Sequence, residues 1–204
     1  TIYQRAKGAQ DTRALGTRRN VYGEGFEWAN HSMFPVSHAD VEDRVVIGGS
    51  QCAQPYSASL LNISAMSFGA LSANAIEALN RGAARGGFYH NTGEGGISRF
   101  HLSGGDVVWN VGTGYFGCGK TIDDKGTRAF CPDQFKENAT KEQVKMIEIK
   151  LSQGAKPAHG GILPAAKITS LIAEARGLGD GPWLTDCASP PRHSAFGSPA
   201  ELIQ

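Results

Sequence analysis

The sequence lacks the features that mark several large classes of protein. Its 20 Lys and Arg residues almost balance 19 Asp and Glu residues, so the net charge is +1 and no strongly basic surface is available to gather nucleic acid. No run of about 18 apolar residues occurs that could cross a bilayer. The N-terminus, from Thr1 to Arg5, carries neither a Met nor the pattern of a signal peptide. We therefore expect a cytoplasmic protein, of which this chain is one part.

Motifs for metal and nucleophilic chemistry are also missing. None of the four cysteines stands in a C-x-x-C pair, and the six histidines match no metal-ligand spacing, so we predict no metal site. No G-x-S-x-G sequence occurs, which argues against a serine hydrolase of the nucleophile-elbow type. Lys120, close to Cys118, could activate that thiol, whereas burial would leave it inert. We favour an inert thiol at Cys118.

Glycine, by contrast, is abundant, with 27 residues in 204. The glycines cluster at 93–96 and at 112–114, which predicts loops where the backbone comes close to another group. The loop at 93–96 is neither a P-loop nor a dinucleotide-binding motif, and a tight turn alone would also explain it. Glu94 lies among three of these glycines and is a candidate ligand-binding carboxylate.

The chain from 60 to 92 has the pattern of a β–α–β unit. The apolar run 60–67 predicts a buried strand, and Ser72 is a suitable N-cap for a helix that Gly86 and Gly87 end. Residues 88–92 predict a second strand, so the two strands should be parallel and joined by a right-handed crossover.

The rest of the chain extends this pattern to about four β/α units. Residues 1–50 predict an arm that packs on the barrel, with a short strand at 45–47, and residues 51–204 predict the barrel itself. Within it we expect an insertion at 97–140 with a helix at 132–138, strands at 144–151 and 183–188, and a helix at 164–176. A complete (β/α)8 TIM barrel needs about 250 residues. We therefore predict an α/β fold that forms the N-terminal half of such a barrel.

Function in such a fold lies at the carboxyl ends of the strands. Polar and glycine residues gather there, at 65–69, 91–96, 150–156 and 189–193. In the strand 144–151, Glu148 and Lys150 share the face that points into the barrel. Lys150 either pairs with Glu148 or meets an anionic ligand at the barrel mouth, and Lys156 in the following loop favours the ligand.

Four segments of the sequence stand out together, and they are Asn62–Ser72, Asn91–Gly96, Glu148–Pro157 and Ser189–Pro191. Together they resemble the FMN-binding domain of glutamate synthase. They occur in the order of that family, and the resemblance covers residues 45–204. Residues 22–28 and 54–59 further resemble the stand-alone branch of the family, which has no fused glutaminase domain.

The resemblance implies an FMN-dependent oxidoreductase that acts on CH–NH2 donors. Its reaction would be the reductive amination of 2-oxoglutarate, through 2-iminoglutarate, to L-glutamate by reduced flavin. Ammonia would be free or derived from glutamine, and a ferredoxin or an NAD(P)H-linked subunit would donate electrons. An iron–sulfur cluster would belong only to the part of the family's sequence that lies beyond this chain.

The same resemblance implies the site residues. Catalytic roles fall on Glu94 and Lys156, and cofactor-binding roles fall on Ala65, Met66, Ser67, Lys150 and Gln153. A cation near flavin N1 stabilises the anionic reduced ring. A second cation can hold a substrate carboxylate, and Glu94 can position ammonia or transfer its proton.

Two departures leave alternatives open. The family has a glutamine that helps to hold 2-oxoglutarate where this chain has Ile162, and His159 also replaces a family residue. The alternative is a related flavin enzyme on another amine or 2-oxo acid, such as N-methylglutamate synthase. A non-catalytic half-barrel, completed by a partner chain or by a second copy, is a further alternative because an open half-barrel exposes sheet edges and apolar surface.

Overall fold

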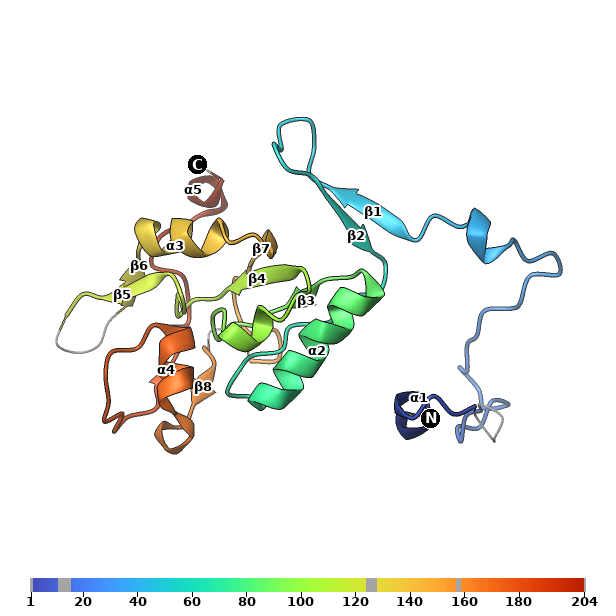
Figure 1. Cartoon of the computed structure of the whole chain (residues 1–204), viewed down its shortest axis with the longest axis horizontal. Coiled ribbons are helices and arrows are strands. Elements are labelled where there is room, and N and C mark those ends of the chain that lie inside the picture. Colours follow the sequence, from blue (N-terminus) through green and yellow to red (C-terminus); the bar gives the residue numbers. More distant parts are fainter. Residues whose placement is uncertain (1, 11–15, 124–127, 157–158, 204) are drawn as a thin grey trace. The chain divides into compact units, whose positions relative to one another are not determined.

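Figure 1 shows a computed structural model of the chain, which describes residues 2–10, 16–123, 128–156 and 159–203. The chain divides into two units between Glu42 and Asp43. The first unit contains α1 (Ile2–Ala6) and the 3-10 helix η1 (His38–Asp40). The predicted arm extended to residue 50, but the structure ends it earlier because β1 (Arg44–Ile47) pairs with β2 (Tyr56–Ser59) in an antiparallel hairpin of the second unit. The packing of the arm on the second unit stays a prediction.

The second unit is built on a parallel sheet. Its strands are β3 (His90–Asn91), β4 (Val107–Val111) and β7 (Val144–Ile149), in the spatial order β3-β4-β7. Ile63 adds a parallel bridge to His90, so the segment before α2 lies beside β3. Spatial order thus follows chain order, as in a barrel and unlike a doubly wound sheet. The fold is α/β as predicted, and the strands of the described residues do not close into a barrel.

The strand β4 corrects the prediction of an insertion at 97–140. All five residues of β4 are buried, and the strand lies between β3 and β7 at the centre of the sheet. The remainder of the segment holds η2 (Arg99–His101), the hairpin of β5 (Gly119–Thr121) with β6 (Arg128–Phe130), and the predicted helix as α3 (Pro132–Ala139). The strand was missed because a strand buried on both faces shows no alternation of apolar and polar residues.

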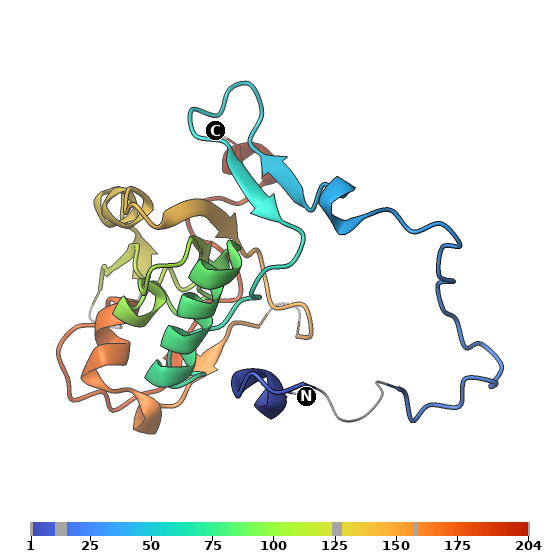
Figure 2. The same cartoon turned by 45° about the vertical axis from the view of Figure 1, so that its right-hand side comes forward.

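The helix α2 (Ala73–Gly86) forms where the sequence predicts it. The Ser72 hydroxyl accepts a hydrogen bond from the Ala75 N–H at 3.3 Å, and Gly87 ends the helix with a φ of +66°. Figures 1 and 2 show α2 lying against β3 and η2. Its Ile76 is fully buried in a core cluster with Phe68 and Ile172.

The C-terminal elements correct two further predictions. The strand expected at 183–188 shrinks to β9 (Cys187–Ala188), which pairs antiparallel with β8 (Ile162–Leu163) outside the parallel sheet. The helix expected at 164–176 divides into η3 (Ala165–Lys167) and α4 (Ser170–Arg176), because the Thr169 hydroxyl accepts the Ile172 N–H and caps α4. The chain then ends in α5 (Pro199–Leu202). The parallel sheet therefore contains β4 and not the strand that was predicted at 183–188.

One side of β7 is open in the part of the chain that the structure describes. There β7 pairs with β4 alone, and Ile147, Ile149 and Leu151 are 37%, 45% and 57% exposed. Parallel strands in folded proteins are normally covered on both sides. No helix among the described residues is both long enough and apolar enough to traverse a bilayer.

The Arg128 guanidinium joins the loop after β4 to the end of α4. Its Nε donates to the Gly114 carbonyl at 3.1 Å, and its terminal nitrogens donate to the carbonyls of Gly119 at 2.6 Å and Gly177 at 2.7 Å. Only the planar fork of an arginine can serve several carbonyls in this way. Arg128 therefore fixes the loop that leads out of the central strand.

We expect Arg128→Met to lower the free energy of unfolding by about 2–4 kcal/mol, because several carbonyls lose a charged donor at once. Urea denaturation measures this loss. Arg99→Met is the matched control, since Arg99 is exposed and its guanidinium lies over the Phe100 ring. Equal losses in the two variants would contradict the structural role of Arg128.

Candidate functional site

The carboxyl ends of the parallel strands surround a hollow of about 390 Å³. The segment after Ile63 and the ends of β3, β4 and β7 all contribute to its wall. The lining residues are Ala65, Ser67, Gly93, Glu94, Asn110, Glu148, Ile149 and Lys150. The structure thus brings together four of the seven residues to which the resemblance gives catalytic or cofactor-binding roles, which are Ala65, Ser67, Glu94 and Lys150.

Lys150 and Glu94 form an ion pair across the top of the sheet. The Lys150 Nζ lies 3.0 Å from Glu94 Oε2 and donates a second hydrogen bond to Gln153 Oε1 at 2.9 Å. The Gln153 Nε2 donates to the same Glu94 Oε2 at 2.6 Å. Of the two interpretations of Lys150, pairing with Glu148 is wrong, because Glu148 instead accepts a hydrogen bond from the Asn110 amide.

Glycines close around the Glu94 carboxylate. A Cβ at Gly161 would collide with Glu94 Oε1, and a Cβ at Gly112 would lie 3.3 Å from the Glu94 Cβ. Gly93 adopts a φ of +63° and passes so close to Ser67 that any side chain there would collide with its hydroxyl. The loop at 93–96 is therefore more than a turn, since it packs the carboxylate against two other strand ends.

The second glycine cluster continues as the motif G-x-G-x-x-G at 112–117, which the sequence analysis did not note. This motif binds a dinucleotide only where a helix N-terminus follows it. Here the segment leads into β5, so the glycines serve close packing instead.

Met66 is held beside the hollow by hydrogen bonds of its backbone, and its side chain points elsewhere. The side chain packs against the core cluster that contains Phe68 and is not part of the lining. Its N–H donates to the Asn91 carbonyl at 3.1 Å, and its carbonyl lies 3.0 Å from His101 Nε2. Because the Ser98 N–H donates to His101 Nδ1, this imidazole is neutral and carries its hydrogen on Nε2. His101 thus holds the segment 65–67 in place.

Buried histidines lie beneath this segment. His90 and His101 are both fully buried, with ring centroids 5.2 Å apart. Burial, and the neighbouring His101, lower the pKa of His90 to about 4. Burial also lowers the pKa of His101, although its bond to the Met66 carbonyl opposes that shift. Both rings are therefore uncharged at neutral pH.

Asn110 is a site residue that sequence reasoning missed. It lies in β4, is 3% exposed and lines the hollow. Its amide nitrogen donates to Glu148, while its Oδ1 is buried and has no hydrogen-bond partner among the described residues. A polar residue inside the apolar run Val107–Val111 was the available signal, because an unpaired buried amide costs about 1–3 kcal/mol.

Other expected residues lie outside the hollow. Lys156 is exposed and does not line it, and Ile162 is 63% exposed on β8. Pro157, the last residue of the third resembling segment, lies outside the described residues. Cys118 is fully buried, and burial raises the pKa of its thiol to about 12, so Lys120 does not activate it.

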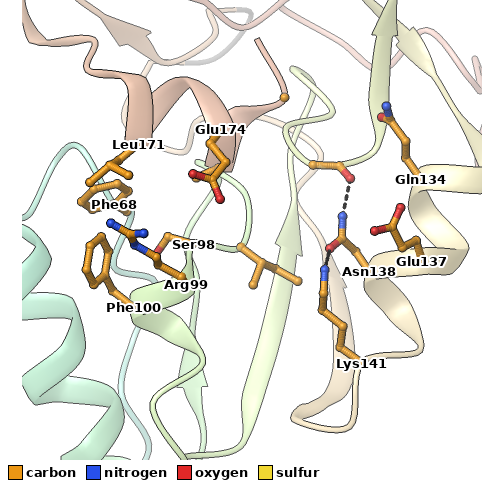
Figure 3. Close-up of a pocket in the computed structure, with 14 residues that line it drawn as sticks. Phe68, Ser98, Arg99, Phe100, Gln134, Glu137, Asn138, Lys141, Leu171 and Glu174 are labelled. Carbon is orange, nitrogen blue, oxygen red and sulfur yellow. Dashed lines mark hydrogen bonds between the residues drawn. The ribbon is translucent and has the colours of Figure 1, made fainter. Parts of the chain in front are cut away.

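A second hollow, of about 310 Å³, lies between η2, α3 and α4 (Figure 3). The Asn138 amide closes one side by donating to the Gly117 carbonyl at 2.7 Å and by accepting from Lys141. Figure 3 shows Arg99, Phe100 and the carboxylate of Glu174 on the side of the hollow that faces Asn138. None of the residues predicted from the sequence as catalytic or cofactor-binding lines this hollow.

Comparison with known proteins now identifies the chain. The family model described as "Conserved region in glutamate synthase" matches residues 27–204, which include every strand of the parallel sheet and every residue around the hollow. The chain belongs to the glutamate synthase family. The predicted resemblance is thus confirmed.

Several curated relatives of the glutamate synthase family align with the chain. The glutamate synthase large subunit-like protein YerD of Bacillus subtilis is 38% identical over 165 residues, 79% of this chain and 30% of the relative. The archaeal-type glutamate synthase [NADPH] of Thermotoga maritima is 36% identical over 141 residues, 69% of this chain and 24% of the relative. A glutamate synthase large subunit-like protein of Rhizobium meliloti is 31% identical over 206 residues, 97% of this chain and 41% of the relative. The chain therefore spans less than half the length of these relatives.

The buried histidines generate a prediction on acid stability. His90 binds a proton at pH 6.5 when unfolded but only at about pH 4 when folded, so the folded state loses stability as the pH falls from 6.5 to 4. The loss should be roughly 3 kcal/mol at pH 4. Urea denaturation at pH 7 and at pH 4.5 should show a smaller loss for His90→Phe than for the parent protein. His31→Gln, at an exposed histidine, is the control. If His90→Phe loses as much stability at pH 4.5 as the parent protein does, the lowered pKa of His90 is not the cause of the acid destabilisation.

Proposed function

We propose that the protein is an FMN-dependent oxidoreductase of the glutamate synthase type, which reductively aminates a 2-oxo acid. The substrate that we propose is 2-oxoglutarate, and the product is glutamate. One observation carries this proposal. Lys150 presents an ammonium group, held by Glu94 and Gln153, at the rim of a hollow formed by the carboxyl ends of parallel strands. That edge is where α/β proteins bind their ligands.

The residues around the hollow fit a flavin ring. The pyrimidine edge of the ring offers several acceptor atoms and one N–H donor. Lys150 would donate to the acceptors, and the unpartnered Oδ1 of Asn110 is a buried acceptor on the same wall. Ala65 and Ser67 are small, and Gly93 touches Ser67 without a side chain, so this wall is low enough for a flat ring. FMN is therefore the cofactor that we propose.

Bound FMN, once reduced, would supply the hydride that converts the imine of the substrate into an amine. The chain's own residues would bind and orient the reactants. The Lys150 cation would favour the reduced, anionic ring, while Gln153 shares the Glu94 carboxylate with it. Glu94 Oε1 has no hydrogen-bond donor among the described residues, so it remains able to accept a proton from ammonium, or from the nitrogen of ammonia once it has added to the carbonyl carbon of the substrate.

The substrate and the electron donor extend the proposal. Lys156, an exposed cation three residues beyond Gln153, would bind the carboxylate of the 2-oxo acid. The relative from Thermotoga maritima carries "NADPH" in its name, which supports electron supply from an NADPH-linked system. Because one side of β7 is open among the described residues, we propose that further strands of a longer protein cover it and complete the site. Ammonia would be taken free or from a glutaminase partner.

Replacing Lys150 by Met in the full-length protein should lower the reduction potential of bound FMN, because the anionic reduced ring loses a nearby cation. We expect a decrease of about 30 mV or more, which for a two-electron couple is about 1.4 kcal/mol. Spectroelectrochemistry measures the potential. Lys145→Met is the matched control, since Lys145 lies near the start of β7, whose end Lys150 follows, and pairs there with Asp106. A potential within about 10 mV of the parent would reject the role of Lys150.

Glu94→Gln should shift the same potential in the opposite direction. The substitution keeps the size of the side chain but removes the negative charge that partly offsets Lys150, so the reduced ring is favoured more strongly. Turnover with a 2-oxo acid and ammonia should also fall by about 10²-fold or more if Glu94 handles the proton. An unchanged turnover would remove Glu94 from the catalytic residues.

A further inference from the structure

A chain of hydrogen bonds ends on the backbone of Lys150. His193 Nε2 lies 2.8 Å from the Lys150 carbonyl oxygen, and His193 Nδ1 lies 3.1 Å from the Tyr115 hydroxyl. That hydroxyl also accepts the Ala195 N–H at 3.1 Å. A carbonyl can only accept, so His193 carries a hydrogen on Nε2 and donates it to Lys150. The Tyr115 hydroxyl is hydrogen-bonded to the other ring nitrogen, Nδ1, so it fixes the orientation of the imidazole.

The side chains of this relay are enclosed. Tyr115 is 2% exposed and His193 is 5% exposed. The His193 ring stacks on Phe196 at a centroid distance of 4.7 Å, and the Tyr115 ring packs edge-on against Phe130 at 5.7 Å. Neither ring can turn away without leaving buried polar atoms unpaired.

Tyr115 has an unusual backbone. Its φ is +47°, in the left-handed region, and it is the one non-glycine residue with a positive φ in the part of the chain that the structure describes. Glycine would adopt this conformation without strain, and glycines stand nearby at 112, 114 and 117. A tyrosine with this backbone is strained, and such strain persists only where the contacts of the residue compensate for it. The hydroxyl at the centre of the relay makes such contacts.

We propose that Tyr115 and His193 are positioning residues, which fix the turn after β7 so that the Lys150 ammonium points at Glu94 and at the flavin edge. This inference rests on the proposed function. It assigns roles to two residues that lie outside the lining of the hollow.

The backbone geometry explains how the relay reaches the ammonium. The Lys150 N–H donates to the Val111 carbonyl at 2.9 Å, so β4 holds one side of this residue, and His193 holds its carbonyl. Lys150 and Gln153 lie on the same turn and bind the same Glu94 oxygen. Release of the Lys150 carbonyl would let the turn rotate and would separate both side chains from Glu94.

The segment that carries His193 is itself anchored over the strand ends. The Thr113 hydroxyl donates to the Pro190 carbonyl at 2.6 Å, and the Ser189 N–H donates to the Gly161 carbonyl at 2.8 Å. These bonds connect the segment 189–193 to the loop after β4 and to the chain beside Glu94. His193 therefore acts from a fixed support.

Four variants of the full-length protein test the inference. Tyr115→Phe removes only the hydroxyl, and His193→Phe keeps a stacking ring but removes the donor to Lys150. His193→Gln restores a donor amide near the Nε2 position and should rescue. Tyr56→Phe is the matched control, because the Tyr56 hydroxyl donates to Asp106 at 2.9 Å, at the opposite end of the strands.

Two measurements separate positioning from general stability. In the cofactor-free protein, hydrogen exchange of the peptide 150–156 should become roughly two- to tenfold faster in Tyr115→Phe and His193→Phe, as loss of one hydrogen bond allows. In the FMN-loaded protein, both variants should lower the flavin potential in the direction of Lys150→Met. His193→Gln and Tyr56→Phe should leave both values at the parent level. In a Lys150→Met background, His193→Phe should cause no further change of potential.

The outcomes distinguish this inference from the proposed function. If Lys150→Met lowers the potential and Tyr115→Phe and His193→Phe do not, the function stands and the positioning role is wrong. If Lys150→Met has no effect, the proposed function fails, and the inference fails with it. Faster exchange in the control Tyr56→Phe, equal to that in Tyr115→Phe, would also overturn the positioning role. Because Tyr115→Phe removes a single oxygen, the test does not depend on whether His193→Phe folds.

Discussion

The ion pair between Lys150 and Glu94 is the interaction on which the site depends. Its two partners come from the ends of β7 and β3, which are not neighbours, because β4 lies between them. A lone ammonium at a partly enclosed strand end would lose part of its hydration and gain no opposite charge in return. The Glu94 carboxylate provides that charge. Gly112, at the end of β4, leaves room for Glu94 to cross above the central strand, since a Cβ there would lie 3.3 Å from the Glu94 Cβ.

Close packing of backbone around that pair accounts for several of the glycines in this sequence. Cβ atoms at Gly93, Gly160 and Gly161 would each collide with a neighbouring strand end or loop, and a Cβ at Gly96 would collide with the Ala175 carbonyl at the end of α4. These positions lie around the hollow and behind it. The glycines thus allow loops from different strands to meet at one place, and this meeting is what brings polar side chains of distant sequence into contact.

Local signals in the sequence predicted what local physics determines. The N-cap at Ser72 and the left-handed stop at Gly87 fixed α2, and parallel pairing correctly placed Glu94 and Lys150 at one edge. Strand β4 escaped detection because burial on both faces removes the two-residue period. Asn110, His101 and His193 each bond a residue 35 or more positions away in sequence, namely Glu148, Met66 and Lys150. Their roles therefore depend on tertiary contacts that no short motif records.

The site also shows why a relay without a carboxylate is a suitable support for a functional cation. A second carboxylate beside Lys150 would hold it firmly but would cancel the field that a reduced cofactor or an anionic substrate must sense. The His193 imidazole, held by the Tyr115 hydroxyl, constrains the Lys150 carbonyl without placing a negative charge beside the ammonium. Glu94 therefore remains the one carboxylate that forms a salt bridge with Lys150 among the described residues, and Gln153, a neutral amide, shares that carboxylate. Glu94 thus sets the charge beside the Lys150 ammonium, whereas His193 and Tyr115 set the position of the Lys150 backbone. A substitution can therefore change the charge without removing the contacts that hold the backbone.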